Sequence, residues 1–180
     1  MPKPRRLFPI LLPVLSFVLI VSFASSACAL GPKADAYVGY SRVGADAFYP
    51  NVGGLNGWQA ALHVKMKPFL GGEADVAQYG LGASSTIPKT TTVMVGPRIT
   101  VGTLGVKAFV HGLAGFEHSA NSSGLSISGS SFSYALGGGF DLPLLPFFAW
   151  RVSGDYLSAP TLSPGSGTHA RFGTGIVFRF

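Results

Sequence analysis

Histidine and serine are the residue types in this sequence that could support nucleophilic catalysis. A serine nucleophile needs a histidine base within hydrogen-bond distance and a third group that orients the base. His118 is followed directly by Ser119, whereas His111 and Glu117 fall on one face of a predicted strand and point inward. For His111 and Glu117 a buried polar pair is the simpler interpretation. We therefore predict no catalytic residues in this chain.

Metal, cofactor and nucleic-acid chemistry also lack candidate residues in the sequence. No cluster of histidine, cysteine and aspartate has the spacing of metal ligands. Gly80-Leu81-Gly82 precedes no predicted helix, so we interpret it as a loop rather than a phosphate-binding turn. The basic residues form no cluster interleaved with aromatic residues. We therefore expect no metal, no cofactor and no nucleic acid.

The charged residues form a clearer pattern. Only 11% of the chain is charged, whereas soluble domains carry about 25%. Beyond residue 29, thirteen of the seventeen charged residues share strand faces with glycine, serine and alanine. The other four lie at strand ends or in loops: Lys33, Arg42, Asp46 and Lys89.

A network of ion pairs inside the protein is the interpretation that this pattern favours. Buried charges need partners, and Arg151 and Asp155 lie four residues apart on one face, so their partners must come from adjacent strands. The predicted lumen network consists of Glu73, Asp75, Arg98, Lys107, Glu117, Asp141, Arg151, Asp155, Arg171 and Arg179.

The elements that must position these charges are β-strands. From Lys33 to Phe180, apolar residues recur at every second position in segments of about ten residues. No window has the spacing of an amphipathic helix. We predict strands at 34–42, 57–67, 69–79, 90–101, 105–117, 131–142, 147–158 and 168–180.

Long and short connections alternate between these strands. The long ones are rich in Gly, Ser, Asn and Pro, and they span 43–56, 80–89, 118–129 and 159–167. The short ones lie at 67–69, 102–104 and 143–146. This alternation is typical of a transmembrane barrel whose long loops face out of the cell.

The alternation within each strand separates bulky side chains from charged ones. In the strand 147–158, Phe148, Trp150 and Tyr156 fall on one face, and Arg151 and Asp155 fall on the other. An Arg or Lys facing lipid at mid-membrane costs about 2–4 kcal/mol, whereas Gly, Ala and Ser fit a narrow lumen.

This separation predicts an all-β fold, an eight-stranded antiparallel up-and-down transmembrane β-barrel. A soluble barrel or sandwich with the apolar face inside is the alternative, but the aromatic bulk is too large for the interior of eight strands. Aromatic residues near strand ends are expected to form two interfacial belts. They are Trp58, Phe116, Tyr134, Tyr156 and Phe172 toward the loops, and Phe140, Phe148, Trp150 and Phe180 toward the turns.

Residues 1–29 are interpreted as an export signal that precedes the barrel domain at 30–180. A charged start up to Arg6 and an apolar run are followed by Ala27 and Ala29, whose small-x-small spacing predicts cleavage after Ala29. A retained membrane helix is one alternative. A lipoprotein acylated at Cys28 is another.

Several short motifs together resemble the outer-membrane protein A-like and opacity-type family of eight-stranded barrels, in particular its barrel-only members. The motifs are Tyr37-Val38-Gly39-Tyr40-Ser41, Asn56-Gly57-Trp58, Gly71-Gly72-Glu73-Ala74-Asp75, Gly96-Pro97-Arg98, Gly137-Gly138-Gly139-Phe140-Asp141 and Arg151 through Asp155-Tyr156. Phe178 and Phe180 look like the signal read by the barrel assembly machinery.

The resemblance implies a monomer in the bacterial outer membrane, with extracellular loops and a periplasmic N-terminus. Its partners would be outer-membrane lipid, the assembly machinery and periplasmic chaperones, and its role structural or surface interaction. An adhesin-type binder and a lipid A-modifying enzyme are the alternatives. The deacylases among such enzymes carry a serine two residues after a histidine on the outer surface, which none of the four histidines here has. The sequence names no loop ligand.

Overall fold

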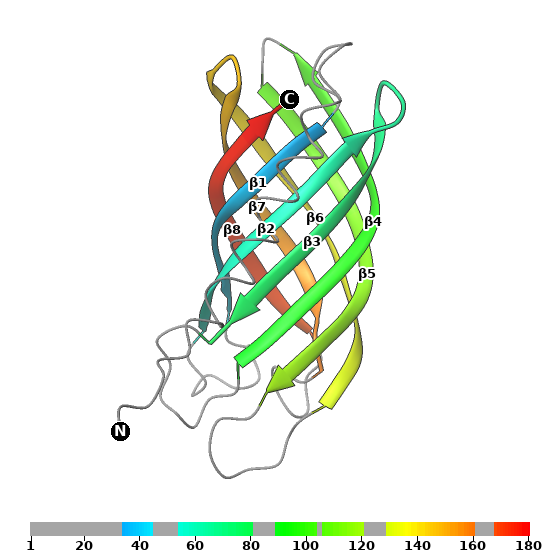
Figure 1. Cartoon of the computed structure of the whole chain (residues 1–180), viewed down its shortest axis with the longest axis vertical. Helices are drawn as coiled ribbons and strands as arrows, with labels where there is room; N and C mark the ends of the chain where they lie inside the picture. The colour runs from blue at the N-terminus through cyan, green and yellow to red at the C-terminus, as the bar shows by residue number, and fades with distance from the viewer. Residues whose placement is uncertain (1–33, 45–53, 81–88, 104–105, 121–128, 161–167) are drawn as a thin grey trace, which may run out of the picture.

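Eight antiparallel strands form a closed barrel in the computed structural model, which describes residues 34–44, 54–80, 89–103, 106–120, 129–160 and 168–180 (Figure 1). Each strand pairs with its neighbour in the chain, and the first pairs with the last. The strands are β1 (Ala34–Val43), β2 (Leu55–Lys65), β3 (Leu70–Tyr79), β4 (Lys89–Thr103), β5 (Val106–Ala120), β6 (Gly129–Leu145), β7 (Phe148–Ser158) and β8 (Thr168–Arg179). The described residues include no helix that is long and apolar enough to cross a membrane.

The predicted fold class is confirmed, and the differences lie at strand ends. β5 and β6 run on to Ala120 and from Gly129, where the sequence predicted a loop over 118–129. Ser119 pairs with Gly129 in this extension. Glycine and serine are typical of loops, but a paired neighbour supplies hydrogen bonds to any backbone, so the ladder continues through them.

Large apolar side chains cover the outside of the barrel and charged ones fill the inside. Trp150 and Tyr156 are 44% and 55% exposed, whereas Arg151 and Asp155, on the same strand, are 2% and 7% exposed. The largest fully buried side chains in the described part of the chain include Arg98. A soluble barrel would have the opposite arrangement, so that alternative is wrong.

Aromatic side chains gather on the outer wall near both ends of the strands. At the loop end the exposed ones are Tyr40, Trp58, Phe116, Phe132, Tyr134, Tyr156 and Phe172, and at the turn end Phe69, Phe140, Phe147, Trp150 and Phe178. Trp150 donates its indole N–H to Thr174 at 2.8 Å, so this polar hydroxyl on the outer wall has a partner. Aliphatic side chains such as Val95 and Val110 lie between the two belts, as expected for a wall facing hydrocarbon.

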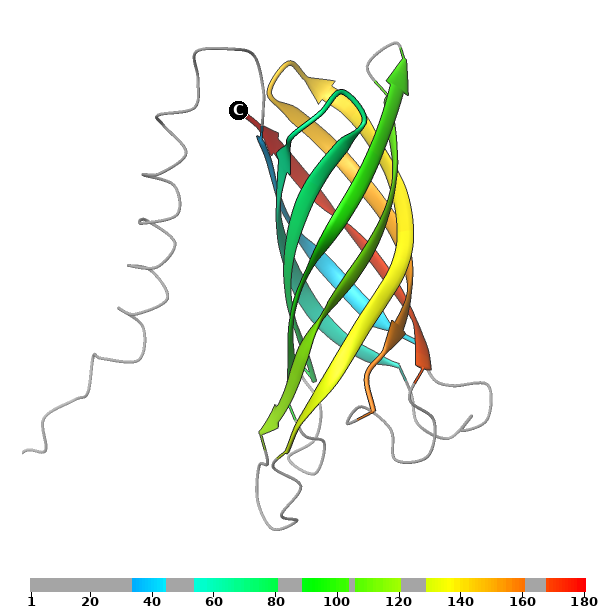
Figure 2. The same cartoon turned by 90° about the vertical axis from the view of Figure 1, so that its right-hand side faces the viewer.

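The lumen is layered, and β5 shows the order of the layers. β5 runs along the barrel (Figure 2). From the turn end, its inward side chains are those of Lys107, Phe109, His111, Leu113, Glu117 and Ser119. Two apolar clusters lie inside the barrel. One, toward the turns, consists of Tyr37, Ala61, Ala149 and Val177, and the other, toward the loops, of Val43, Ala77, Tyr79, Met94, Leu113, Ala135, Leu157 and Ala159.

Candidate functional site

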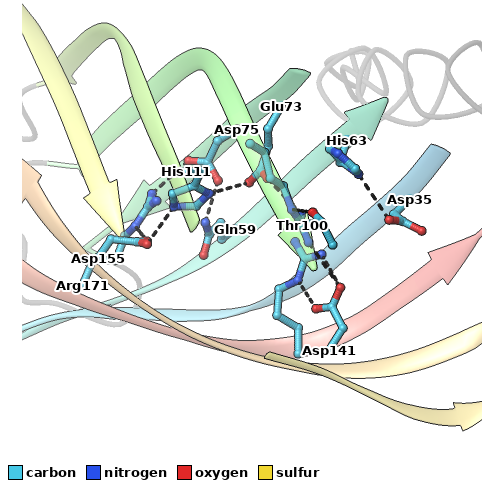
Figure 3. A network of polar contacts seen from close by, with 12 residues as sticks. Asp35, Gln59, His63, Glu73, Asp75, Thr100, His111, Asp141, Asp155 and Arg171 are labelled. Atoms are coloured by element: carbon cyan, nitrogen blue, oxygen red, sulfur yellow. Dashed lines mark hydrogen bonds and ion pairs between the residues drawn. The ribbon is translucent and has the colours of Figure 1, made fainter. Parts of the chain in front are cut away.

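A connected set of charged side chains occupies the lumen between the two apolar clusters (Figure 3). Arg151 on β7 donates from Nε and Nη2 to the two carboxylate oxygens of Asp141 on β6, at 2.7 and 3.0 Å. Arg98 on β4 donates to the same Asp141 at 3.3 Å and to Glu73 on β3 at 2.9 Å. These two arginines therefore tie four strands together through two carboxylates.

His111 extends the network across the barrel. Its Nδ1 lies 3.1 Å from Oε1 of Glu73 on β3, and its Nε2 lies 2.8 Å from Oδ1 of Asp155 on β7. A carboxylate only accepts hydrogen bonds, so both ring nitrogens must donate. This arrangement requires the positively charged imidazolium form of His111.

Arg171 on β8 completes the network on its far side. Its Nε donates to Asp155 at 2.7 Å and its Nη1 to Asp75 on β3 at 2.9 Å. Asp75 also accepts from Gln59 on β2 at 2.5 Å. The connected side chains thus come from seven of the eight strands, β2 to β8.

Charge balance follows from the members of this network. It contains the four carboxylates of Glu73, Asp75, Asp141 and Asp155, and the three guanidinium groups of Arg98, Arg151 and Arg171, none of them more than 7% exposed. His111 supplies the fourth positive charge when both of its ring nitrogens are protonated. Because an unpaired charge in a dry interior is costly, this neutrality is what allows the network to be buried.

Two inward-facing aromatic residues, which the sequence analysis did not assign to the lumen, support the arginines. The guanidinium of Arg98 lies 3.8 Å from the ring centre of Phe109, and that of Arg151 lies 4.7 Å from Phe109 and 4.9 Å from Tyr37. The sequence could have predicted the inward position of Phe109, because Phe109 lies two residues from both Lys107 and His111 and therefore shares their face of the strand.

Two residues of the predicted network, Lys107 and Arg179, lie outside this connected set. At the turn end, Lys107 reaches Asp35 at 3.7 Å, and Arg179 forms no ion pair with the described residues. Glu117 is fully buried nearer the loop end. It lies six residues from His111 on one strand, about 20 Å away, so the expected pairing of Glu117 with His111 is wrong.

The predicted assembly residues lie at the seam between β8 and β1. Phe178 is on the outer wall and its ring meets that of Phe148 edge-on, with 4.9 Å between centroids. Phe180 exchanges two backbone hydrogen bonds with Ala34, both 3.0 Å. The predicted cleavage residues, Ala27 and Ala29, lie outside the described residues.

A histidine and a serine also meet on the outer wall near the loop end. Ser130 and His118 are paired across β6 and β5, with 3.1 Å between Oγ and Nδ1, and both are exposed. Sequence spacing missed this pair because its members lie on different strands. No acidic side chain of the described residues contacts His118.

Comparison with solved structures identifies the class of barrel. Ail, the attachment invasion locus protein of Yersinia pestis, matches with a TM-score of 0.58 and 24% identity over 84% of this chain and 100% of its own. Neisserial surface protein A matches with a TM-score of 0.62 and 13% identity, covering 82% of this chain and 96% of its own. The fold is that of the small outer-membrane barrels.

A third match, the N-terminal β-barrel domain of Pseudomonas aeruginosa OprF, has a TM-score of 0.58 and 13% identity, and covers 83% of this chain and 99% of its own. No protein-family model and no curated protein sequence matches the chain. The expected resemblance to small eight-stranded outer-membrane barrels is therefore confirmed at the level of the fold.

Proposed function

We propose that the protein is an integral outer-membrane barrel with a structural or surface-interaction role and a sealed lumen. One observation carries the proposal: the barrel is apolar outside and holds a charge-balanced network inside, between two apolar clusters. The wall suits hydrocarbon, and the filled interior of eight strands leaves no wide aqueous path.

The alternating connections support an orientation with the long loops outside the cell and the N-terminus in the periplasm. The three short connections and the start of β1 are at one end of the barrel, together with the end of β8 (Figure 1). Outer-membrane barrels place short turns in the periplasm and long loops outside. Any specificity for molecules outside the cell would then belong to the loop end.

Membrane fractionation with boiled and unboiled gel samples tests this proposal. We expect the protein in the outer-membrane fraction and a faster-migrating folded band that disappears on boiling. In planar bilayers the purified protein should show no steadily open pore. Recovery in the soluble fraction would contradict the membrane placement, and a stable, large conductance would contradict the sealed lumen.

Export and assembly belong to the same proposal. Residues 1–29 would act as the signal, with cleavage after Ala29, and the barrel domain would occupy 30–180. Phe178 and Phe180 would be read by the barrel assembly machinery after delivery by periplasmic chaperones, and the folded product would be a monomer in outer-membrane lipid. N-terminal sequencing of the purified protein tests the cleavage site.

Adhesion is the first alternative, and the name of Ail, an attachment invasion locus protein, provides the reason to test it. Binding of intact cells to host-cell layers should then depend on the loops. Shortening each loop in turn, with folding checked by gel shift, separates adhesion from a purely structural role.

Lipid modification is the second alternative, and the hydrogen bond between His118 and Ser130 is the observation that favours testing it. In a β-ladder the neighbouring backbone N–H groups are used by strand pairing, so the strand offers few donors to stabilise an oxyanion. Lipid A mass spectra of cells with the protein, without it and with Ser130→Ala decide the matter. Identical spectra would exclude the activity on lipid A.

A further inference from the structure

A second group of charged side chains surrounds the turn end of the lumen, beyond the apolar cluster of Tyr37, Ala61, Ala149 and Val177. Asp35 on β1 lies directly between His63 on β2 and Arg179 on β8 in the strand register. Lys107 reaches Asp35 from β5, with its Nζ 3.7 Å from Oδ1. We refer to Asp35, His63, Lys107 and Arg179 as the turn-end mouth.

Hydrogen-bond donors outnumber acceptors in the turn-end mouth. Nε and Nη2 of Arg179 are shielded from solvent and have no hydrogen-bond partner among the described residues. His63 Nδ1 lies 3.3 Å from Asp35, so that one carboxylate is shared between His63 and Lys107. These two guanidinium donors of Arg179 are therefore free to bind an anionic group from outside the chain.

The acidic groups nearby do not meet this need. Asp141 is opposite Lys107 in the β5–β6 register, but it accepts hydrogen bonds from Arg98 and Arg151. The main-chain oxygen of Phe180 accepts from the Ala34 amide at 3.0 Å. Among the side chains of the described residues, the mouth therefore holds two permanent cations, Lys107 and Arg179, and one carboxylate, that of Asp35.

The turn between β2 and β3 extends this positive region along the rim. Lys65 and Lys67 are exposed there, and they alternate with Met66 and Phe69, which are 72% and 66% exposed. Exposed apolar side chains beside lysines suit the boundary between acyl chains and headgroups, because lysine stems lie along apolar surface while the ammonium groups reach phosphate.

We propose that the turn-end mouth and the β2–β3 turn together bind the phosphate of an anionic phospholipid in the leaflet at that end of the barrel. The proposal rests on the membrane placement above, since only a spanning barrel brings this rim to the headgroups. A zwitterionic headgroup carries its own cation, for which the mouth offers only the shared Asp35 carboxylate.

Native mass spectrometry of the folded protein in detergent, with added phosphatidylglycerol or phosphatidylcholine of equal chain length, tests the proposal. We expect tighter binding of phosphatidylglycerol. Because each basic residue near an anionic surface contributes about 1 kcal/mol, Lys107→Gln and Arg179→Gln should each weaken that binding about fivefold. Lys89→Gln, an exposed charge at the opposite end, is the matched control and should change nothing.

The variant Asp35→Asn makes the test sharper, because it predicts the opposite sign. It removes the competing carboxylate, so phosphatidylglycerol should bind more tightly than to the parent protein. Competition by inorganic phosphate would show that phosphate alone suffices, and its failure to compete would show that the lipid-borne phosphate is needed.

Equal affinity for the two lipids, or loss of binding in Lys89→Gln as large as in Lys107→Gln, would overturn the proposal. The gel shift between boiled and unboiled samples confirms that each variant is folded. Because binding is measured in detergent, a failure here leaves the membrane placement untouched, and fractionation tests that separately.

Discussion

The guanidinium carbon of Arg98 lies 3.8 Å from the centre of the Phe109 ring, and the two side chains come from neighbouring strands inside the lumen. Arg151 approaches the same ring at 4.7 Å, and both arginines donate to Asp141. One aromatic ring and one carboxylate are therefore shared by two buried cations, so the aromatic ring is part of the charge network.

Replacing this ring should destabilise the barrel. Phe109→Leu keeps much of the volume but removes two cation–π contacts, each worth about 0.5–2 kcal/mol. We expect the free energy of unfolding to fall by about 1–3 kcal/mol in urea titrations of the protein in lipid vesicles. Phe140→Leu on the outer wall is the control and should lose less.

Removing Asp155 should leave two buried cations with one partner fewer. Arg171 and His111 each donate to this carboxylate, so Asp155→Ala is expected to cost about 3–5 kcal/mol. The temperature at which the folded gel band disappears should fall. Asp155→Asn retains an acceptor oxygen, so this temperature should fall less in that variant. An unchanged temperature in Asp155→Ala would show that the network does not stabilise the barrel.

The protonation state of His111 can be measured directly. Because each ring nitrogen faces a carboxylate oxygen, at 3.1 and 2.8 Å, nitrogen NMR of the folded protein at pH 7 should show a proton on both. The exposed His118 gives a comparison spectrum. A neutral ring at His111 would mean that the network carries a net negative charge or that one carboxylate is protonated.

Gly137 is required by the position of Asp155. A Cβ on Gly137 would overlap the main-chain oxygen of Gly154 and Oδ1 of Asp155, which the hydrogen bond to His111 holds in place. Gly137→Ala should therefore reduce the yield of folded band on refolding. Gly129→Ala is the control on the same strand, since a Cβ there meets nothing within 4 Å. Equal yields of folded band for the two variants would show that the β6–β7 pairing can shift to make room for the added Cβ.

A substitution at Phe180 should affect assembly in cells without affecting the stability of the folded barrel. If Phe180 is part of a recognition signal, Phe180→Ser should lower the amount of barrel in the outer membrane of cells while refolding in detergent stays unchanged. Phe147→Ser, at another exposed aromatic residue of the turn end, should leave cellular assembly intact. A parallel loss in both assays would indicate a packing role instead.

The sequence was sufficient to predict the strands and their inward and outward faces, because alternation is a local property with a period of two residues. It was not sufficient to predict which charges meet. Arg171 and Asp75 are separated by 96 residues, and their 2.9 Å contact depends on how far each strand is shifted along its neighbours. Tyr37 and Phe109 were missed because no aromatic residue was assigned to the lumen, although the parity of these two residues places them inside.

The pairing of β1 with β8 joins Asp35 to Arg179, the beginning of the barrel to its end. The barrel closes only when β1 and β8 are both present. An incomplete sheet has two edge strands whose unpaired backbone groups can pair with other chains. Synthesis and closure are therefore separate events in time. Closure needs every strand from Ala34 to Arg179 to be present at once.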